Sequence, residues 1–287
     1  MSALPRLEYE VHGSGPPMLM VHGFASSRFT WRNLVEAYEH DYTVITVDLL
    51  GHGASPKPRS ADYSISYQAR LLHELIREKE LSDLTLLGHS YGGAVALKLC
   101  LDLLDESSDC LRRLVLIGGA AYQQPFPPFI GILRRPILGR IIPLFAPPMF
   151  SAKRALQLAI HDQSRVTPEQ LEGWAAPNRE PGIKNSLRQT ALQILPDNLA
   201  SLTSRYSEIE VPTLLMWGSE DRVVPLSIGQ RLSKEIPKAE LHIVDDCGHI
   251  PHEELPEDTL DILDPFCLLY TSPSPRDLST SRMPSSA

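Results

Sequence analysis

Short apolar runs alternate with amphipathic stretches along most of this chain of 287 residues. Runs of about four to eight apolar residues are typical of buried strands, whereas apolar residues about three or four positions apart are typical of helices that pack on a sheet by one face. The alternation predicts an α/β fold in which helices cover both faces of a mostly parallel sheet. We expect strands at residues 7–11, 18–21, 42–49, 84–87, 114–117, 213–217 and 241–244, and helices at residues 29–38, 65–79, 91–104 and 226–236.

The alternation stops between residues 122 and 207, a stretch with helical patches and many prolines but no convincing strand. A bare loop of that length is uncommon inside a compact domain. We therefore expect an inserted helical lid over the carboxyl ends of the strands, where open α/β folds bind ligands. In this division, residues 1–121 and 208–266 form the core and residues 122–207 form the lid.

The composition changes abruptly at Cys267, and residues 267–287 are mostly Ser, Pro and Thr without periodicity. A disordered tail is one interpretation. The order of residues 267–277 and 282–287 also resembles a frame translation of the two constant blocks of a transposon-type sequencing adapter. We favour the second interpretation and expect residues 267–287 to be a non-native tail.

The charge of the chain disfavours nucleic acid as a partner, because 27 basic and 35 acidic residues give a formal net charge of -8 without a dense run of Lys or Arg.

Neither a signal peptide nor a spanning helix is expected, since the most apolar stretch, residues 141–150, is short and broken by prolines. The 4 cysteines lack the spacing of a metal site, and reduced thiols in a cytoplasmic protein explain them better than disulfides. Membrane association is not expected, and the sequence does not indicate an oligomeric state.

The strongest local motif is the hexapeptide GHSYGG at residues 88–93, which lies between the predicted strand 84–87 and a predicted helix. A nucleophile on so sharp a turn has a strained backbone and needs small residues two positions before and after it, here Gly88 and Gly92. The amino terminus of the helix favours the negative charge that develops there. The motif predicts that Ser90 is a catalytic nucleophile, with a purely structural turn as the alternative.

A serine hydroxyl needs a base in order to attack at neutral pH. His249 is the best candidate, since it follows the last predicted strand on a loop that emerges at the same edge of the sheet as Ser90. His252 is the competitor, but it follows Pro251 near the start of a helix. The sequence therefore favours His249 as the general base.

The third residue of such a site is a carboxylate that holds the histidine tautomer and stabilises the imidazolium. Asp221 follows the predicted strand 213–217, and its neighbour Glu220 is the alternative. The end of the strand 114–117 offers no acid. Asp221 is therefore the predicted orienting acid.

An anionic tetrahedral intermediate also needs hydrogen-bond donors. The backbone amide of Tyr91, directly after the nucleophile, supplies one, and we expect the second from the amide of Phe24 in the loop after the strand 18–21. The side chains of Phe24, His89 and Tyr91 are expected to line the substrate pocket. His89 is badly placed to take a proton from the adjacent Ser90.

Five segments of the sequence match a known family in order. They are HGF at residues 22–24, DLLGHGAS at 48–55, GHSYGG at 88–93, GSEDRVVP at 218–225 and GH at 248–249. Together they resemble the capped α/β-hydrolase superfamily over nearly all of residues 7–266, and the chain order Ser90, Asp221, His249 is also that of the superfamily. The resemblance implies an eight-stranded, mostly parallel sheet with one antiparallel strand. It also excludes the haloalkane dehalogenase and epoxide hydrolase branches, whose nucleophile is Asp.

Other polar residues of these segments are expected to be structural rather than catalytic. In relatives, the segment of Asp48 and His52 shapes a turn. We expect His22 to fix a loop by hydrogen bonding rather than to act as a base, and Cys247 to be buried and inert.

The leading hypothesis for the function is hydrolysis of a small or medium carboxylic ester through an acyl-Ser90 intermediate. The alternative is carbon–carbon bond hydrolysis of the meta-cleavage product type, and a thioester or lactone substrate also stays open. A non-catalytic ligand receptor on a hydrolase fold is the hypothesis from a different class.

The apolar segment 125–150 either lines an acyl or aromatic cavity or packs the lid onto the core, and docking on a membrane surface through its arginines is a lesser alternative. No metal or organic cofactor is implied, because the histidines lack metalloprotease spacing and the glycine pairs 13/15 and 51/53 lack the third glycine of a dinucleotide loop. The expected partner is a small molecule with an apolar acyl or aromatic group.

Overall fold

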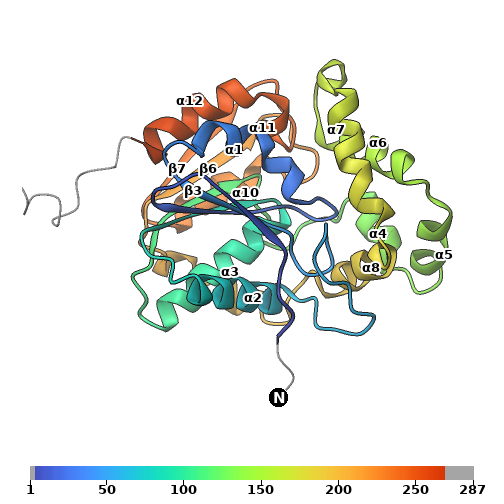
Figure 1. The fold of residues 1–287 in the computed structure, drawn as a ribbon, viewed down its shortest axis with the longest axis horizontal. Coiled ribbons are helices and arrows are strands. Elements are labelled where there is room, and N and C mark those ends of the chain that lie inside the picture. Colours follow the sequence, from blue (N-terminus) through green and yellow to red (C-terminus); the bar gives the residue numbers. More distant parts are fainter. Residues whose placement is uncertain (1–3, 269–287) are drawn as a thin grey trace, which may run out of the picture.

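The sheet of the computed structural model lies among helices (Figure 1). Its strand order is β1-β3-β2-β4-β5-β6-β7. β1 is antiparallel to β3, and all other neighbouring strands are parallel. The structure describes residues 4–268, so the predicted non-native tail lies outside the described residues except for its first two positions. The strands are β1 (Tyr9–His12), β2 (Pro17–Val21), β3 (Thr43–Val47), β4 (Leu84–His89), β5 (Leu111–Ile117), β6 (Thr213–Gly218) and β7 (Ala239–Val244).

The predicted α/β fold is confirmed, but the expected number of strands is wrong, since the sheet has seven strands rather than eight within residues 4–268. Residues 4–8, which precede β1, form no strand, so β1 pairs only with β3 and is an edge of the sheet. The number eight came from the resemblance. The apolar runs were the better guide, because each of the seven runs overlaps one strand of the structure.

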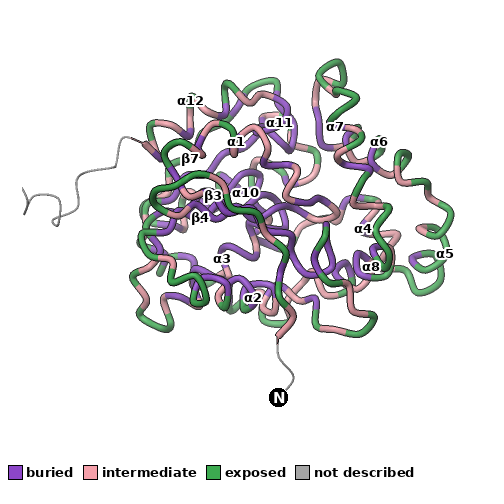
Figure 2. Tube along the Cα trace, viewed as in Figure 1, coloured by how far each residue is buried: buried purple, intermediate pink, exposed green. Residues whose placement is uncertain are grey.

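Helices cover both faces of the sheet because the pleat of a strand sends successive side chains to opposite sides. In β2, Leu19 packs into one apolar layer and the next residue, Met20, packs into the other. Figure 2 shows the five inner strands mostly buried between the two layers of helices, whereas the edge strands β1 and β7 are largely exposed or half-buried. One layer contains α2 (Ile65–Glu78), α3 (Tyr91–Asp105) and α10 (Leu226–Glu235), and the other contains α1 (Arg32–Tyr38) and α12 (Pro256–Cys267).

The chain between β5 and β6 folds into helices that lie together beside the core (Figure 1). Proline begins several of them, at a position where its missing amide hydrogen would have no helical acceptor. Across residues 4–268, every helix is too short or too polar to span a lipid bilayer. The helices between β5 and β6 are α4 (Pro128–Arg134), α5 (Leu138–Phe145), α6 (Pro148–Ala159), α7 (Pro168–Ala175), α8 (Ile183–Gln193) and α9 (Leu199–Thr203), with 3-10 turns η2 (Gln163–Arg165), η3 (Ala176–Arg179) and η4 (Tyr206–Glu208).

A small apolar cluster joins these helices to the core. Leu156 of α6 and Trp174 of α7 pack together with Ile250, which lies in the loop after β7. Ile250 directly precedes α11 (Pro251–Glu254) and directly follows His249. The loop that carries the predicted base is therefore packed against helices of the inserted segment.

Candidate active site

Ser90 occupies the turn between β4 and α3 with φ 53° and ψ -119°, a positive φ that residues with a side chain rarely adopt. A Cβ atom on Gly88 would lie 2.7 Å from the carbonyl oxygen of Gly92, and one on Gly92 would lie 2.2 Å from that of Val21. The Ser90 amide donates to the carbonyl of Ile117 at 3.1 Å. Contacts from β2 and β5 therefore hold the strained turn in place.

His249 and Asp221 face each other from the loops after β7 and β6. Their Nδ1 and Oδ2 atoms are 2.7 Å apart, and both side chains are almost fully buried. The other carboxylate oxygen of Asp221 accepts the amides of Val223 and Val224, each at 2.8 Å. The alternative acid, Glu220, is exposed to solvent. The fixed carboxylate favours a proton on Nδ1 of His249, which leaves Nε2 as the basic atom.

Ser90 and His249 both line a cavity of about 580 Å³. A Cβ atom on Gly118 would lie 3.0 Å from His249 Nδ1, and one on Gly23 would lie 3.0 Å from Ser90 Cβ, so glycines allow the backbone to approach the site. Among the hydrogen bonds of residues 4–268, none joins the Ser90 hydroxyl to the His249 ring. Such bonds are often long in free enzymes and tighten when substrate is bound.

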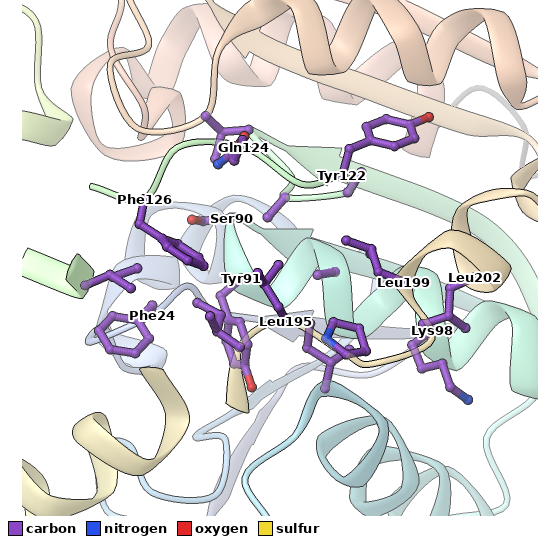
Figure 3. Close-up of a pocket in the computed structure, with 18 of the residues that line it drawn as sticks. Phe24, Ser90, Tyr91, Lys98, Tyr122, Gln124, Phe126, Leu195, Leu199 and Leu202 are labelled. Atoms are coloured by element: carbon purple, nitrogen blue, oxygen red, sulfur yellow. The ribbon is translucent and has the colours of Figure 1, made fainter. Parts of the chain in front are cut away.

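A second cavity of about 80 Å³ also reaches Ser90 (Figure 3). Phe24 lines both cavities, Tyr91 lines the smaller one and His89 lines the larger one. The three side chains expected at the pocket therefore lie there. The helices between β5 and β6 supply much of the remaining apolar wall, which in Figure 3 includes Leu199 and Leu202 of α9 and the nearby Leu195.

His252, the competing base, lines neither cavity. Its Nε2 lies 3.0 Å from the hydroxyl of Thr30, which donates its own hydrogen to Glu253, and its ring stacks on Trp31 with the centroids 4.7 Å apart. Burial lowers the pKa of His252 to about 3, so this ring is neutral at neutral pH. His252 is placed to pack the interior and not to accept the Ser90 proton.

His89 is buried between the nucleophile and the His249 loop. Its Nε2 donates to the backbone carbonyl of His249 at 3.0 Å, and since a carbonyl only accepts, the proton must be on Nε2. Burial lowers the pKa of His89 well below its usual range. The neutral ring therefore holds the backbone of the loop that carries His249.

Glu254 ties the same loop to the inserted helices, a role that the sequence analysis missed. Its Oε2 accepts the amides of Gly248 at 2.8 Å and His161 at 3.1 Å, and its Oε1 accepts the amide of Asp162 at 2.8 Å. The His249 amide in turn donates to the carbonyl that ends α6, at 2.6 Å. One buried carboxylate thus links the segment after α6 to the residue before His249.

Glu253 forms a second buried link, also missed. Its carboxylate accepts from Arg32 Nη1 at 2.7 Å, from Gln170 Nε2 at 3.1 Å and from Trp174 Nε1 at 3.1 Å. Arg32 belongs to the core, whereas Gln170 and Trp174 belong to α7. Two acids at the start of a helix are ordinarily explained by their favourable interaction with the helix dipole. Nothing in the sequence therefore indicated that Glu253 contacts distant partners.

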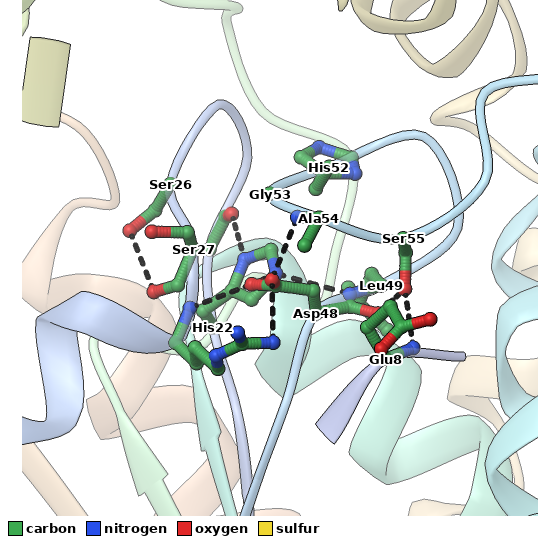
Figure 4. A network of polar contacts seen from close by, with 12 residues as sticks. Glu8, His22, Ser26, Ser27, Asp48, Leu49, His52, Gly53, Ala54 and Ser55 are labelled. Atoms are coloured by element: carbon green, nitrogen blue, oxygen red, sulfur yellow. Dashed lines mark hydrogen bonds and ion pairs between the residues drawn. The ribbon is translucent and has the colours of Figure 1, made fainter. Parts of the chain in front are cut away.

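The loop of Phe24 is fixed by His22, whose two ring nitrogens both have partners (Figure 4). Nδ1 donates to the carbonyl of Gly23 at 2.8 Å, and Nε2 accepts the Leu49 amide at 3.1 Å. This requires a neutral ring, and burial lowers the pKa of His22 accordingly. The amide of Phe24 has no acceptor within residues 4–268, and the amide of Tyr91, the first residue of α3, has none inside the helix.

Asp48 and His52 lie in a tight turn and line neither cavity. Asp48 accepts the amides of Arg28 and Ala54, each at 2.8 Å (Figure 4). His52 Nδ1 donates to the carbonyl of Leu50 at 3.2 Å, and burial lowers the pKa of His52 to about 3. These contacts are the ones that a turn-forming segment needs.

Cys247 is buried, lines neither cavity, and has its pKa raised, chiefly by burial. A thiol with a raised pKa is a poor nucleophile at neutral pH. Within residues 4–268, no group of His, Cys, Asp and Glu side chains has the arrangement of a metal site.

Comparisons with known proteins agree with this fold. The model of a family described as "alpha/beta hydrolase fold" matches residues 16–256. The chain is 30% identical over 254 residues to a 2-hydroxy-6-oxo-6-phenylhexa-2,4-dienoate hydrolase of Comamonas testosteroni, covering 85% of this chain and 84% of the relative. It is 28% identical over 253 residues to an uncharacterised hydrolase of Bacillus subtilis (strain 168), covering 84% of this chain and 85% of the relative.

Among solved structures, a thermophilic esterase from Thermogutta terrifontis is similar to this chain with a TM-score of 0.75 and 25% sequence identity, over 91% of this chain and 92% of the esterase. The family match spans both the Ser90 turn and the His249 loop. The chain therefore belongs to the α/β-hydrolase fold family.

Proposed function

We propose that this protein is a serine hydrolase that cleaves small or medium carboxylic esters, with Ser90 as nucleophile, His249 as general base and Asp221 as the orienting acid. The observation that carries the proposal is the 2.7 Å contact between Asp221 and His249 at the wall of a cavity that Ser90 also lines. A pure binding protein has no need of a buried carboxylate–imidazole pair beside a strained serine. This geometry favours a catalyst over a receptor.

In the first half of the reaction, Nε2 of His249 takes the hydroxyl proton of Ser90 while the serine oxygen bonds to the ester carbonyl carbon. The negative charge moves to the carbonyl oxygen, where the amides of Phe24 and Tyr91 stabilise it. His249 then gives the proton to the leaving alcohol oxygen as the carbon–oxygen bond breaks. Asp221 stabilises the imidazolium that exists between these two proton transfers.

In the second half, His249 takes a proton from water as the water oxygen attacks the acyl carbon. The bond to Ser90 breaks, and the serine oxygen recovers its proton from His249. The products are the carboxylic acid and the free enzyme. The same base therefore serves both halves of the reaction.

Residues 122–207 would act as a lid on a core formed by residues 1–121 and 208–266. The helices of this segment supply much of the wall of both cavities, and most of that wall is apolar. Ligand pockets of this type enclose apolar groups and orient them through a few polar atoms. We therefore propose an apolar acyl or aromatic group in the substrate.

Carbon–carbon bond hydrolysis is the second candidate, because the 30% identical relative is named as a dienoate hydrolase. In that reaction a carbon atom of the substrate, and not an alcohol oxygen, would leave with the proton. The same Ser90, His249 and Asp221 would serve both reactions. The two candidates differ in the substrate alone.

The test is an activity screen of p-nitrophenyl esters of graded acyl length beside 2-hydroxy-6-oxo-6-phenylhexa-2,4-dienoate, with Ser90→Ala protein as the blank. Ester turnover above the blank without dienoate turnover supports the ester proposal. Dienoate turnover with a higher kcat/KM than any ester supports the second candidate. Turnover of neither class, or equal turnover by Ser90→Ala, contradicts both.

A further inference from the structure

The inserted helices expose large apolar side chains that no other part of residues 4–268 covers. Within residues 4–268, most of the exposed large apolar side chains fall in residues 137–150, which include α5 and the start of α6. Phe145 is 81% exposed, Ile137 68% and Leu144 62%. Gly139 is the only buried residue of α5. We call these exposed side chains of residues 137–150 the α5–α6 surface; apolar patches of this kind ordinarily mark a contact site.

Cations surround the α5–α6 surface, although the chain as a whole is acidic. Residues 122–161 contain no Asp or Glu, in a chain with a formal net charge of -8. This segment therefore carries a local positive charge. The exposed cations are Arg135, Arg140, Lys153 and Arg154, and none of them forms an ion pair with another residue within 4–268.

We propose that the α5–α6 surface docks on a bilayer that contains anionic lipid. An apolar helix flanked by Lys and Arg buries its apolar side chains at the boundary between headgroups and acyl chains, while the cations attract anionic headgroups. A second copy of the chain is a poorer fit, because a symmetric dimer through this surface would bring its unpaired cations against their own copies. The surface needs negative charge opposite it, and an anionic membrane supplies that charge.

One hydrogen bond holds α5 against α8, and a second holds the neighbouring α4 against α8. Lys184 Nζ donates to the carbonyl of Leu144 at 3.1 Å, and Arg134 Nη1 donates to that of Ala191 at 2.7 Å. Both contacts join the exposed helix or its neighbour α4 to α8. The surface is therefore a fixed face of the inserted helices.

The α5–α6 surface also borders the larger cavity. Ile142 and Phe150 are partly exposed, and both line the cavity that contains Ser90 and His249. Docking would therefore bring an entrance of this cavity close to the lipid. An apolar substrate dissolved in the bilayer would reach the cavity without crossing water.

The test is co-sedimentation of the full chain with vesicles of phosphatidylcholine alone or of phosphatidylcholine and phosphatidylglycerol in equal parts. We expect binding to the mixed vesicles, little binding to phosphatidylcholine alone, and weaker binding as salt is added. Because the experiment measures binding and not turnover, Ser90→Ala protein must bind the vesicles as strongly as the wild type does. Failure of this test would leave the proposed hydrolase function untouched.

Two double variants separate the apolar and the electrostatic contributions. Ile137→Ser with Phe145→Ser should weaken binding by roughly 10-fold or more for each side chain removed. Arg140→Gln with Lys153→Gln should weaken it by about 5-fold for each charge removed. The matched controls are Val11→Ser with Ile243→Ser, two exposed apolar residues on the edge strands, and Arg77→Gln on α2, none of which should change binding.

Three results would overturn the proposal. The first is no binding to the mixed vesicles by protein whose circular dichroism shows it folded. The second is equal binding by wild type and by both double variants. The third is a dimer in sedimentation velocity that Ile137→Ser with Phe145→Ser abolishes, together with no vesicle binding, since this would assign the surface to a second copy.

Discussion

The carboxyl edge of the sheet and the α5–α6 surface differ in which kind of side chain is buried and which kind is exposed. Around His249, buried polar groups hold the loop after β7: Asp221 holds the ring, His89 holds the backbone carbonyl, and Glu254 holds the amide of the preceding residue. On the α5–α6 surface, large apolar side chains are exposed and the neighbouring cations lack ion pairs within residues 4–268.

The buried polar contacts fix the positions of side chains in the proposed active site, whereas the exposed apolar side chains are free to contact an external partner. A buried polar group is tolerated only when hydrogen bonds replace those it made with water, which also fixes its position. An exposed apolar side chain has no such constraint and contributes little to stability. Substitutions at the sheet edge should therefore change turnover and stability. Substitutions on the part of the α5–α6 surface that lines neither cavity should change neither with a water-soluble ester.

The largest expected effect is that of Ser90→Ala, which removes the proposed nucleophile. We expect turnover of the best p-nitrophenyl ester to fall by roughly 10⁵- to 10⁶-fold, as in serine hydrolases that lose their nucleophile. Steady-state kinetics of purified protein provide the measurement. Ser26→Ala is the matched control, because Ser26 lines the same cavity and should keep a rate near that of the wild type. A rate for Ser90→Ala within the range of the control would remove Ser90 from the mechanism.

Asp221→Asn should cost about 10⁴-fold in kcat, because an amide in this position favours the wrong tautomer of His249. The backbone contacts to Val223 and Val224 can persist, so the fold should be retained. Glu220→Gln, one residue away and exposed, is the control and should be near wild type. If Glu220→Gln were the damaging change, the assignment of the orienting acid would be wrong.

Glu254→Gln tests whether the buried link to the inserted helices positions His249. The amide nitrogen of Gln would face backbone donors, so we expect a loss of about 2 kcal/mol in the free energy of unfolding and a fall in kcat of roughly 10- to 100-fold. Urea denaturation and ester kinetics give the two values. Glu257→Gln, an exposed acid on α12, is the control. Loss of stability without loss of kcat would make the link structural only.

Acid should destabilise the fold through its buried neutral histidines. The pKa values of His52 and His252 are lowered to about 3, whereas an unfolded histidine titrates near its usual value of about 6.5. Their stabilisation is therefore present above about pH 6.5 and falls by up to about 1.4 kcal/mol per pH unit for each ring as the pH drops towards 3. His52→Gln should show a shallower loss of unfolding free energy between about pH 6.5 and about pH 5. Identical slopes for variant and wild type would refute this assignment.

The smallest effect is expected from Phe145→Ser on the hydrolysis of a short water-soluble ester. Phe145 is exposed and lines neither cavity. Surface substitutions of this kind typically change stability by less than about 0.5 kcal/mol. Parallel kinetics and urea denaturation check both values. A large fall in kcat would show that the two regions are not independent.

Local patterns in the sequence were enough to predict the strands and the turn of Ser90. The apolar runs mark the five inner strands because those strands are buried on both faces. The glycines around Ser90 mark the turn because a Cβ atom on Gly88 or Gly92 would collide with neighbouring backbone. The resemblance added an eighth strand that residues 4–268 do not contain.

The links through Glu253 and Glu254 could not be predicted, because their partners are distant in the sequence. Glu253 contacts Thr30, 223 positions away in the sequence, and Gln170, 83 positions away. Glu254 contacts His161, 93 positions away. A sequence shows that two acids begin a helix but not which donors the fold brings to them. Long-range polar contacts depend on the complete packing of the chain.

Where the apolar side chains of residues 125–150 point could not be predicted from the sequence either. Their composition indicated either a cavity wall or a packed interface. In the structure, Ile130 lines both cavities, whereas Phe145 points to solvent. Since α5 exposes its apolar side chains, composition alone could not show which of them face solvent and which face a cavity.

Labelling with a fluorophosphonate probe, located by peptide mass spectrometry, tests the central claim most directly. Folded wild-type protein should carry one phosphonyl group on Ser90, because only a serine beside a base and two amide donors reacts readily with such a probe. Ser90→Ala protein and urea-unfolded protein should stay unlabelled. A folded wild-type protein that does not react, or a label that persists in Ser90→Ala, would contradict the account.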